Sequence, residues 1–147
     1  MEAAEMLKEE LAKVDEEGTA AWNRHDVDTI LGQLADDFVW RDTSLPGPLN
    51  RKEEVRDDVS SWFNAFPDME VTVTDRVIGE DKVAGEVEFT GTNTGPLKVG
   101  ETEIPATGKR VTGKGAYLSH VENGKITEFS MHPDVAGLMM QMGLMSR

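Results

Sequence analysis

An Asn123-Gly124 dipeptide between two runs of alternating residues is the feature that most constrains the fold of this chain. A two-residue type I′ turn needs positive φ at both central positions, and Asn-Gly accepts that backbone. Pairing residues outward from the turn sets Val121 against Ile126 and His120 against Thr127. At that register one face of the hairpin is apolar except for an imidazole and a hydroxyl: Ala116, Leu118, His120, Thr127, Phe129 and Met131. We therefore expect a long C-terminal hairpin that turns this face toward a core or a pocket.

The rest of the chain divides into a helical half and a strand half. Apolar residues at spacings of three and four predict a first helix up to Asn23, a short second helix with Asp26 as its N-cap, and a third over about 51–65. A brief strand is expected at 38–40. From Met69 the period changes to two, which predicts strands over about 69–78, 83–92, 110–121 and 125–131, with a loop or long hairpin tip over 91–108.

This order predicts a single α+β domain over residues 1–147. Three N-terminal helices would pack on a strongly curved antiparallel sheet of about four long strands, and a short C-terminal helix would begin at Asp134. Helices over the concave face of such a sheet would enclose a conical cavity.

Composition excludes several classes of function. The chain has no cysteine, which excludes disulfides, thiol catalysis and cysteine-bound metals. Its net charge of −13, from 28 acidic and 15 basic residues, argues against nucleic acid and anionic lipid as partners. We expect no membrane partner and a cytoplasmic location, since no apolar run is long enough to span a bilayer and the N-terminus has no signal-peptide pattern. His25, His120 and His132 have no metal-ligand spacing, so no metal site is expected.

Six short segments follow one another in a familiar order. They are Trp22-Asn23-Arg24-His25-Asp26, Asp36-Asp37-Phe38-Val39-Trp40-Arg41-Asp42, Phe66-Pro67-Asp68, Ala106-Thr107-Gly108-Lys109, Asn123-Gly124-Lys125-Ile126, and Asp134 with Gln141-Met142-Gly143-Leu144. This order resembles that of the SnoaL-like polyketide cyclases, which belong to the nuclear-transport-factor-2-like superfamily. The resemblance covers nearly the whole chain. A mild departure is Gln141-Met142-Gly143, where the family usually has Gln-Leu-Gly.

The resemblance implies a cone-shaped α+β barrel with a pocket inside and a homodimer formed through the sheet. It also implies an activity, which is intramolecular aldol ring closure of a small hydrophobic carbonyl-bearing molecule without metal or cofactor. The aspartate that serves as acid–base group in the family matches Asp134. A family histidine matches His120, and a polar residue late in the third helix matches Asn64.

Each of these three residues also has a structural interpretation. Asp134 follows a proline and is well placed to cap the last helix, and a capping carboxylate is a weaker base. His120 can be a core or solvent-facing histidine, and Asp134 lies about 23 Å further along if the strand is extended. His132, two residues from Asp134, is an alternative partner. Asn64 can simply end the third helix, or it can donate a hydrogen bond to a substrate carbonyl or enolate.

Aromatic side chains and a second aspartate complete the candidate site. Stacking on a planar ligand is one role for the aromatic residues, and packing in the core is the other. The aromatic candidates are Trp22, Trp40, Trp62, Phe63 and Phe66, and Met131 is a further candidate for contact with the substrate. Asp42 stands before a Pro/Gly-rich loop, where similar ketosteroid isomerases keep their general base, and it can equally cap that loop.

Three functions follow from these residues. The first is a SnoaL-like cyclase with Asp134 as base, and the second is a ketosteroid-isomerase-like enzyme with Asp42 as base. The third is a non-enzymatic module that binds an apolar small molecule or another subunit. The same superfamily contains all three kinds of protein, so the fold alone does not choose among them.

Overall fold

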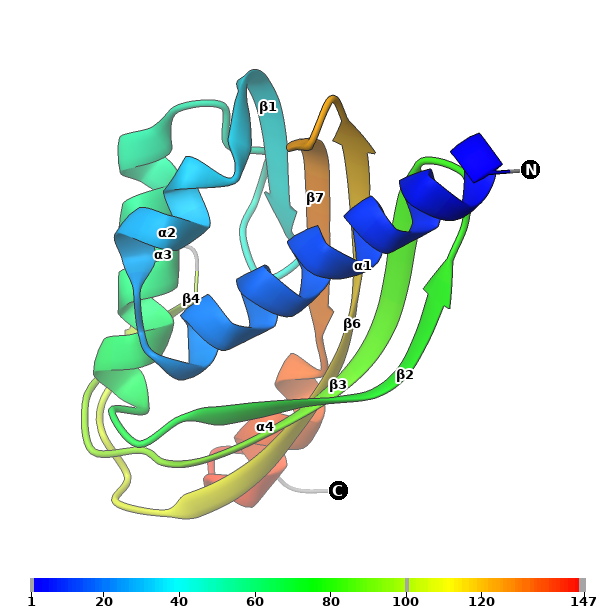
Figure 1. The fold of residues 1–147 in the computed structure, drawn as a ribbon. Coiled ribbons are helices and arrows are strands. Elements are labelled where there is room, and N and C mark those ends of the chain that lie inside the picture. The colour runs from blue at the N-terminus through cyan, green and yellow to red at the C-terminus, as the bar shows by residue number, and fades with distance from the viewer. Residues whose placement is uncertain (1, 100, 146–147) are drawn as a thin grey trace.

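The computed structural model describes residues 2–99 and 101–145 (Figure 1). The elements in chain order are α1 (Glu2–Asn23), α2 (Val27–Gly32), β1 (Leu34–Asp42), α3 (Lys52–Ala65), β2 (Glu70–Ile78), β3 (Lys82–Thr92), β4 (Leu97–Val99), β5 (Thr102–Ile104), β6 (Arg110–Glu122), β7 (Lys125–Pro133) and α4 (Val135–Gln141). The expected α+β class is confirmed.

The main sheet has five strands in the order β1-β7-β6-β3-β2 and is mixed. Strands β2, β3, β6 and β7 form the expected antiparallel meander, but β1 pairs with β7 in parallel. The predicted brief strand at 38–40 is therefore too short, and the all-antiparallel sheet is wrong. Parallel pairing between strands far apart in sequence leaves no local turn signal, since the connection runs through most of the chain.

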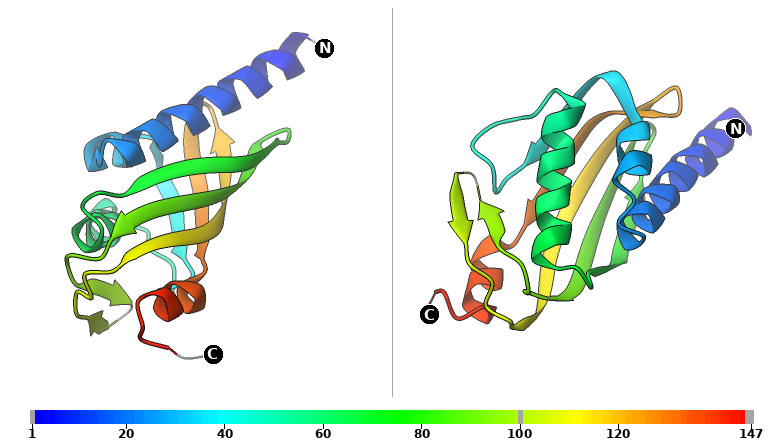
Figure 2. Two further views of the ribbon diagram at one scale, coloured as in Figure 1. Left: turned by 90° about the horizontal axis from the view of Figure 1, so that it is seen from below. Right: turned by 90° about the vertical axis from the view of Figure 1, so that its left-hand side faces the viewer.

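The sheet is open rather than closed. Within the described residues β1 and β2 are its two edges, and β4 and β5 form a separate two-stranded sheet in the predicted loop over 91–108. Figure 2 shows α1 and α3 lying against the same side of the twisted sheet, with α4 at the end of β7. The predicted closed cone-shaped barrel is thus not confirmed, although helices do cover one face.

Local signals set the helix boundaries. The Asp26 carboxylate accepts hydrogen bonds from the Thr29 backbone N–H (3.1 Å) and the Thr29 hydroxyl (2.6 Å), which confirms Asp26 as the N-cap of α2. Before it, His25 has a φ of +55°, and this left-handed residue turns the chain sharply between α1 and α2.

The C-terminal hairpin has the predicted turn but a different register. Asn123 (φ +51°) and Gly124 (φ +76°) both have positive φ, as a type I′ turn requires. Val121 pairs with Ile126 as expected, but a β-bulge then leaves Thr127 as an extra residue, so that His120 opposes Glu128. Because side chains alternate along a strand, this slip of one residue changes the faces of the hairpin.

The predicted inner face of the hairpin is therefore wrong for β6. Phe129 pairs with Ser119 and Met131 pairs with Tyr117, and these four residues share the face that α1 covers. Of the residues expected there from β6, Leu118 and His120 alternate with them and lie on the opposite face, whereas Ala116 borders the cavity.

A second bulge changes the face of β2. Val73 pairs with Val87, but Asp75 pairs with Glu86 and Arg76 with Gly85, which leaves Thr74 as the extra residue. An unbroken alternation would have turned Asp75 inward. The bulge instead turns the Arg76 side chain toward α1.

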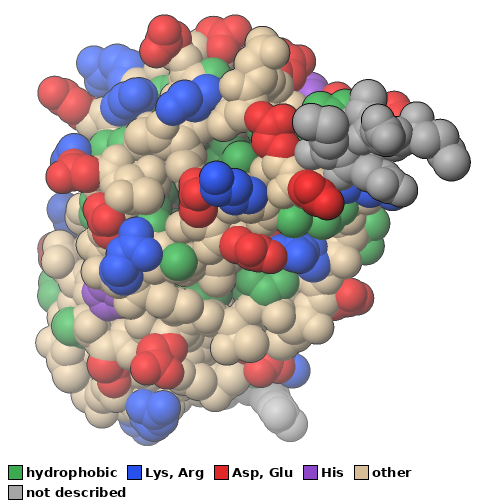
Figure 3. Space-filling model, in the orientation of Figure 1, with side chains coloured by type: hydrophobic (Ala, Val, Ile, Leu, Met, Phe, Trp, Pro, Cys, Tyr) green, Lys and Arg blue, Asp and Glu red, His purple; other side chains and the backbone are tan. Residues whose placement is uncertain are grey.

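The core lies between the helices and this inner face. It is built mainly from aromatic and branched side chains, including Phe38, Trp40, Val55, Val59, Trp62, Phe66, Val83, Phe89 and Val111. Figure 3 shows acidic and basic side chains interspersed over one face of the molecule. Among the helices that the structure describes, none has the length and apolar character needed to cross a bilayer.

The outer face of the sheet makes the predicted homodimer testable. Leu118 is 40% exposed on β6, the middle strand, and its neighbours Ala84 and Ser130 are small. If this face forms the dimer, Leu118→Lys should weaken association at least about tenfold, because the new charge would be desolvated. Light scattering after gel filtration measures the mass. Leu7→Lys is the control, because Leu7 is an exposed residue of α1, and this variant should keep the wild-type mass. A monomeric wild type would contradict the prediction.

Candidate functional site

The inner face of the sheet and the helices enclose a cavity of about 140 Å³. Helix α1 supplies one side, α2 and the start of β1 supply another, and the strands form the floor. Its lining is almost entirely apolar and aromatic, and includes Leu11, Trp22, Ile30, Trp40, Trp62, Met69, Val83, Phe89, Val121, Phe129 and Met131. An apolar cavity of about 150 Å³ holds a benzene molecule, so this one fits a small ligand or one ring of a larger one.

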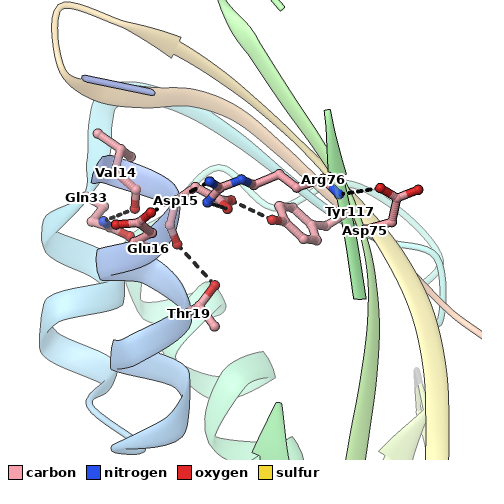
Figure 4. A network of polar contacts seen from close by, with 8 residues as sticks. All are labelled: Val14, Asp15, Glu16, Thr19, Gln33, Asp75, Arg76 and Tyr117. Carbon is pink, nitrogen blue, oxygen red and sulfur yellow. Dashed lines mark hydrogen bonds and ion pairs between the residues drawn. The ribbon is translucent and has the colours of Figure 1, made fainter. Parts of the chain in front are cut away.

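A polar cluster lies at the α1 side of this cavity (Figure 4). The Tyr117 hydroxyl donates to Asp15 Oδ1 at 2.6 Å, and Arg76 Nη1 lies 3.3 Å from Asp15 Oδ2. The Asp15 side chain is only 6% exposed, and among the described lining residues it is the one with a carboxylate. The three side chains come from α1, β2 and β6, so the cluster also ties the helix to the sheet.

The Asp15 carboxylate keeps acceptor positions for a ligand. Two oxygens offer about four lone-pair positions, while Tyr117 and Arg76 take one on each oxygen. A buried carboxylate beside an apolar cavity and a hydroxyl donor can move a proton to and from a bound carbonyl compound.

Tyr117 stays in its protonated form in this setting. Burial, followed by the hydrogen bond to Asp15 and the negative charge of Asp15, raises the pKa of Tyr117 well above its usual value near 10. Arg76 opposes the shift only in part. The phenol is therefore a hydrogen-bond donor at neutral pH, and it is not a base.

The absence of a side chain at Gly85 leaves room for the Tyr117 ring. The two residues are paired across β3 and β6, and a Cβ atom at position 85 would overlap the Tyr117 ring. Because glycine has no side chain, the ring can lie flat over the strand and reach Asp15. The same relation recurs nearby, where the Phe89 ring covers Gly113.

Asp134 lies outside the cavity lining. Its carboxylate accepts the Gly137 backbone N–H at 2.9 Å and caps α4, and the residue is exposed. This geometry matches the capping alternative for Asp134. Its role in catalysis stays a prediction.

His120 and Asn64 also lie away from the cavity. His120 Nε2 is 2.8 Å from Asp81 Oδ2 in the turn between β2 and β3, on the outer side of the sheet. Asn64 is exposed near the end of α3, where its carbonyl packs against Gly95. His132, the alternative histidine, borders the cavity, but the residue is exposed and its Nε2 is 3.3 Å from Ser130 Oγ on the outer face of the sheet. The structure therefore does not bring Asp134, His120 and Asn64 together.

Three of the five aromatic residues predicted to stack on a ligand line the cavity, and they are Trp22 on α1, Trp40 on β1 and Trp62 on α3. Met131 on β7, predicted to contact the substrate, also lines it, whereas Phe66 packs in the core. Phe63 also packs in the core, where its ring stacks on His25 with centroids 4.2 Å apart.

Asp42 lies behind the cavity wall in contact with a second buried carboxyl group, Asp58. Trp40 Nε1 donates to Asp58 Oδ2 at 3.1 Å, and Trp62 Nε1 donates to Asp42 Oδ2 at 3.2 Å. Asp42 Oδ1 also accepts the Ser44 backbone N–H and hydroxyl, at 2.8 and 2.6 Å. Strand β1 and helix α3 each contribute one indole and one carboxyl group, so the two elements are joined by a crossed pair of hydrogen bonds.

This environment favours the protonated form of the Asp58 carboxyl group. Burial, the negative charge of Asp42 and the hydrogen bond between the two carboxyl groups raise the pKa of Asp58 to about 8. The Trp40 N–H, which favours the charged form, opposes the shift.

Sequence reasoning missed Asp15, Arg76, Tyr117 and Asp58. Asp15 and Asp58 look like surface residues of amphipathic helices, because many acidic side chains surround them in sequence. Gly85 and Gly113, one on each of two predicted strands, were the available signal, since a glycine inside a strand often makes room for a ring.

The family of the chain is established by comparison. The profile of the SnoaL-like polyketide cyclase family matches residues 12–142, nearly the full length, and the chain belongs to this family. No relative among curated protein sequences matches the chain.

Solved structures share the fold. AclR from Streptomyces galilaeus, described as a candidate hydroxylase, is 24% identical with a TM-score of 0.81, over 95% of this chain and 85% of that one. A candidate SnoaL-like polyketide cyclase from Jannaschia sp. CCS1 is 18% identical with a TM-score of 0.83, over 95% and 96%. IdmH from Streptomyces antibioticus, a candidate polyketide cyclase, is 24% identical with a TM-score of 0.75, over 90% and 97%.

Filling the space above Gly85 tests the position of Tyr117. Gly85→Ala should lower the free energy of unfolding by about 1–3 kcal/mol, because the ring must leave its place. The displaced ring should also lose its bond to Asp15, which lowers the pKa of this single tyrosine in a spectrophotometric titration. Gly47→Ala, where a Cβ meets nothing within 4 Å, is the control and should change stability by less than about 0.5 kcal/mol. Equal effects in both variants would contradict this placement.

The raised pKa of Asp58 predicts a pH dependence of stability. Its folded pKa of about 8 exceeds the usual aspartate value of 3.8, so the stabilisation is complete below about pH 4 and is lost as pH rises through 8. The Asp58→Asn variant should lack this loss of stability at high pH. The free energy of unfolding of Asp58→Asn minus that of wild type should therefore increase by more than about 1 kcal/mol between pH 5 and pH 9. Asp57→Asn, exposed on the same helix, is the control. Urea titrations across pH measure both, and parallel curves for wild type and Asp58→Asn would refute the assignment.

Proposed function

We propose that the chain catalyses intramolecular aldol ring closure of a small hydrophobic carbonyl compound, with Asp15 as the acid–base group. The observation that carries this proposal is the buried Asp15 carboxylate, which borders an apolar cavity and is hydrogen-bonded to Tyr117. Membership in the SnoaL-like family supports the reaction class.

The chemistry needs one group that takes and returns a proton. Asp15 removes an activated C–H proton beside a carbonyl, and the electron pair of that bond forms an enolate. The enolate carbon attacks a second carbonyl carbon of the same molecule, which becomes an alkoxide. The protonated Asp15 then returns its proton to this alkoxide, so that the enzyme ends in its starting form.

Other lining residues fit supporting roles. The Tyr117 hydroxyl and the Ser119 hydroxyl lie two residues apart on the inner face of β6, and both residues line the cavity. The Ser119 hydroxyl can donate to the enolate oxygen as charge develops there, while the Tyr117 hydroxyl donates to Asp15. The aromatic lining holds the substrate folded, which brings the two reacting carbons together.

Isomerisation of cyclohex-3-enone to its conjugated isomer tests proton transfer in the cavity. This one-ring ketone carries an activated C–H between its carbonyl and its double bond, and ultraviolet absorbance follows the product. Asp15→Asn should lower the rate about 10²–10⁴-fold, the usual contribution of a general base. Ligand binding, measured by saturation-transfer NMR, should be retained.

Two further variants separate the alternatives. Asp134→Asn tests the aspartate that the family resemblance favours, and Asp42→Asn tests the isomerase-like base. Wild-type rates in Asp134→Asn and a large loss in Asp15→Asn would support the proposal. A loss confined to Asp134→Asn or to Asp42→Asn would overturn the role of Asp15. A wild type no faster than buffer would overturn acid–base catalysis and favour a binding module.

A further inference from the structure

The crossed contact between β1 and α3 forms part of the cavity itself. Trp40 and Trp62 both line the cavity, and their indole N–H groups point away from it to Asp58 and Asp42. The Trp40 ring also stacks on Phe129 with centroids 4.5 Å apart. The carboxyl pair therefore fixes two aromatic walls from behind without touching a ligand.

We infer that Asp42 and Asp58 share one proton and act as positioning residues for a ligand in the cavity. The singly protonated pair holds the Trp40 and Trp62 rings in the ligand-binding arrangement, and loss of that proton weakens binding. The inference rests on the proposed function only in taking this cavity as the ligand site.

The number of donors decides where the proton lies. Asp42 accepts three hydrogen bonds, from the Ser44 N–H, the Ser44 hydroxyl and the Trp62 indole. Asp58 accepts one in the described contacts, from Trp40. A carboxylate that receives more donors is stabilised in its charged form, so Asp58 carries the proton and donates it to Asp42.

Removing the proton places two negative charges together in the core. Asp42 is 3% exposed and Asp58 is 8% exposed, so water screens their repulsion poorly. The charges can separate only if β1 and α3 move apart, and each carboxyl group is bonded to an indole on the other element. The repulsion is therefore transmitted to both cavity walls.

Elements packed against α3 also bring the charged residues Asp28 and Lys98 to this helix. From α2, Asp28 pairs with Arg56 at 2.7 Å on the exposed side of α3. From β4, Lys98 contacts α3 through its backbone N–H, which donates to Ser61 Oγ. Asp42, from β1, is the charged group that shifts the proton affinity of Asp58.

The indole N–H signals test the shared proton directly. The chain has three tryptophans, and ¹H–¹⁵N spectra resolve one indole signal from each. Between pH 6.5 and 9.5, the Trp40 and Trp62 signals should shift together with a midpoint near 8, while Trp22 on α1 should not follow that midpoint. Asp58→Asn should remove the transition, because an amide can donate to Asp42 and accept from Trp40 without titrating. Asp57→Asn should leave it unchanged.

Affinity for cyclohexanone, a ring of suitable size that has no double bond to isomerise, tests the effect on the cavity. Wild type should bind roughly tenfold more weakly at pH 9.5 than at pH 7.5, as expected when the ligand shifts a linked pKa by about one unit. In Asp58→Asn the affinity should be constant over this range. A profile that persists in Asp58→Asn would overturn the inference and assign the effect to another group such as His132.

The two proposals can fail separately. Indole signals that do not titrate near pH 8 in wild type would overturn the shared proton, whatever the rate with cyclohex-3-enone. An Asp15→Asn variant that keeps its rate would overturn the proposed base and would leave the indole transition intact.

Discussion

The alternation of side chains along the strands decides what this molecule can do inside its cavity. A strand without irregularities presents every second residue to the same face, and a single extra residue exchanges the two faces. The bulge at Thr74 turns Arg76 inward, and the bulge at Thr127 aligns Phe129 and Met131 with Ser119 and Tyr117. The polar cluster and the aromatic floor both follow from these two residues.

The molecule accommodates buried carboxyl groups in two different ways. Asp15 contacts the guanidinium of Arg76 and accepts a hydrogen bond from the Tyr117 hydroxyl. Asp42 and Asp58 have no cation among their described contacts, so the pair reduces its charge by holding a proton. The first arrangement leaves a carboxylate facing the cavity, and the second gives a neutral support for the cavity wall. These different neighbours underlie the two proposals, in which one site acts in proton transfer and the other in positioning.

Sequence patterns predicted the features that depend on neighbouring residues. The Asp26 cap and the Asn123-Gly124 turn each need only a few consecutive residues, and both are confirmed. The parallel pairing of β1 with β7 and the two bulges depend on contacts between distant segments, which no local period encodes. The same limit applies to the site, since Tyr117 and Asp15 are 102 residues apart in the chain. The order of helices and strands predicted the α+β class, whereas the family resemblance directed attention to Asp134, which caps a helix outside the cavity.

The size of the cavity connects the two proposals. About 140 Å³ leaves a bound ring in van der Waals contact with most of its walls, so a small displacement of a wall changes the fit. Trp40 and Trp62 are the walls whose outer edges are held by titratable groups, whereas the opposite side is held by the link between Tyr117 and Asp15. A ligand between the two sides would touch Asp15 directly, but it would be compressed or released by the Asp42–Asp58 pair without touching it. Substrate selection in this chain should therefore depend as much on the groups behind the aromatic walls as on the residues that face the ligand.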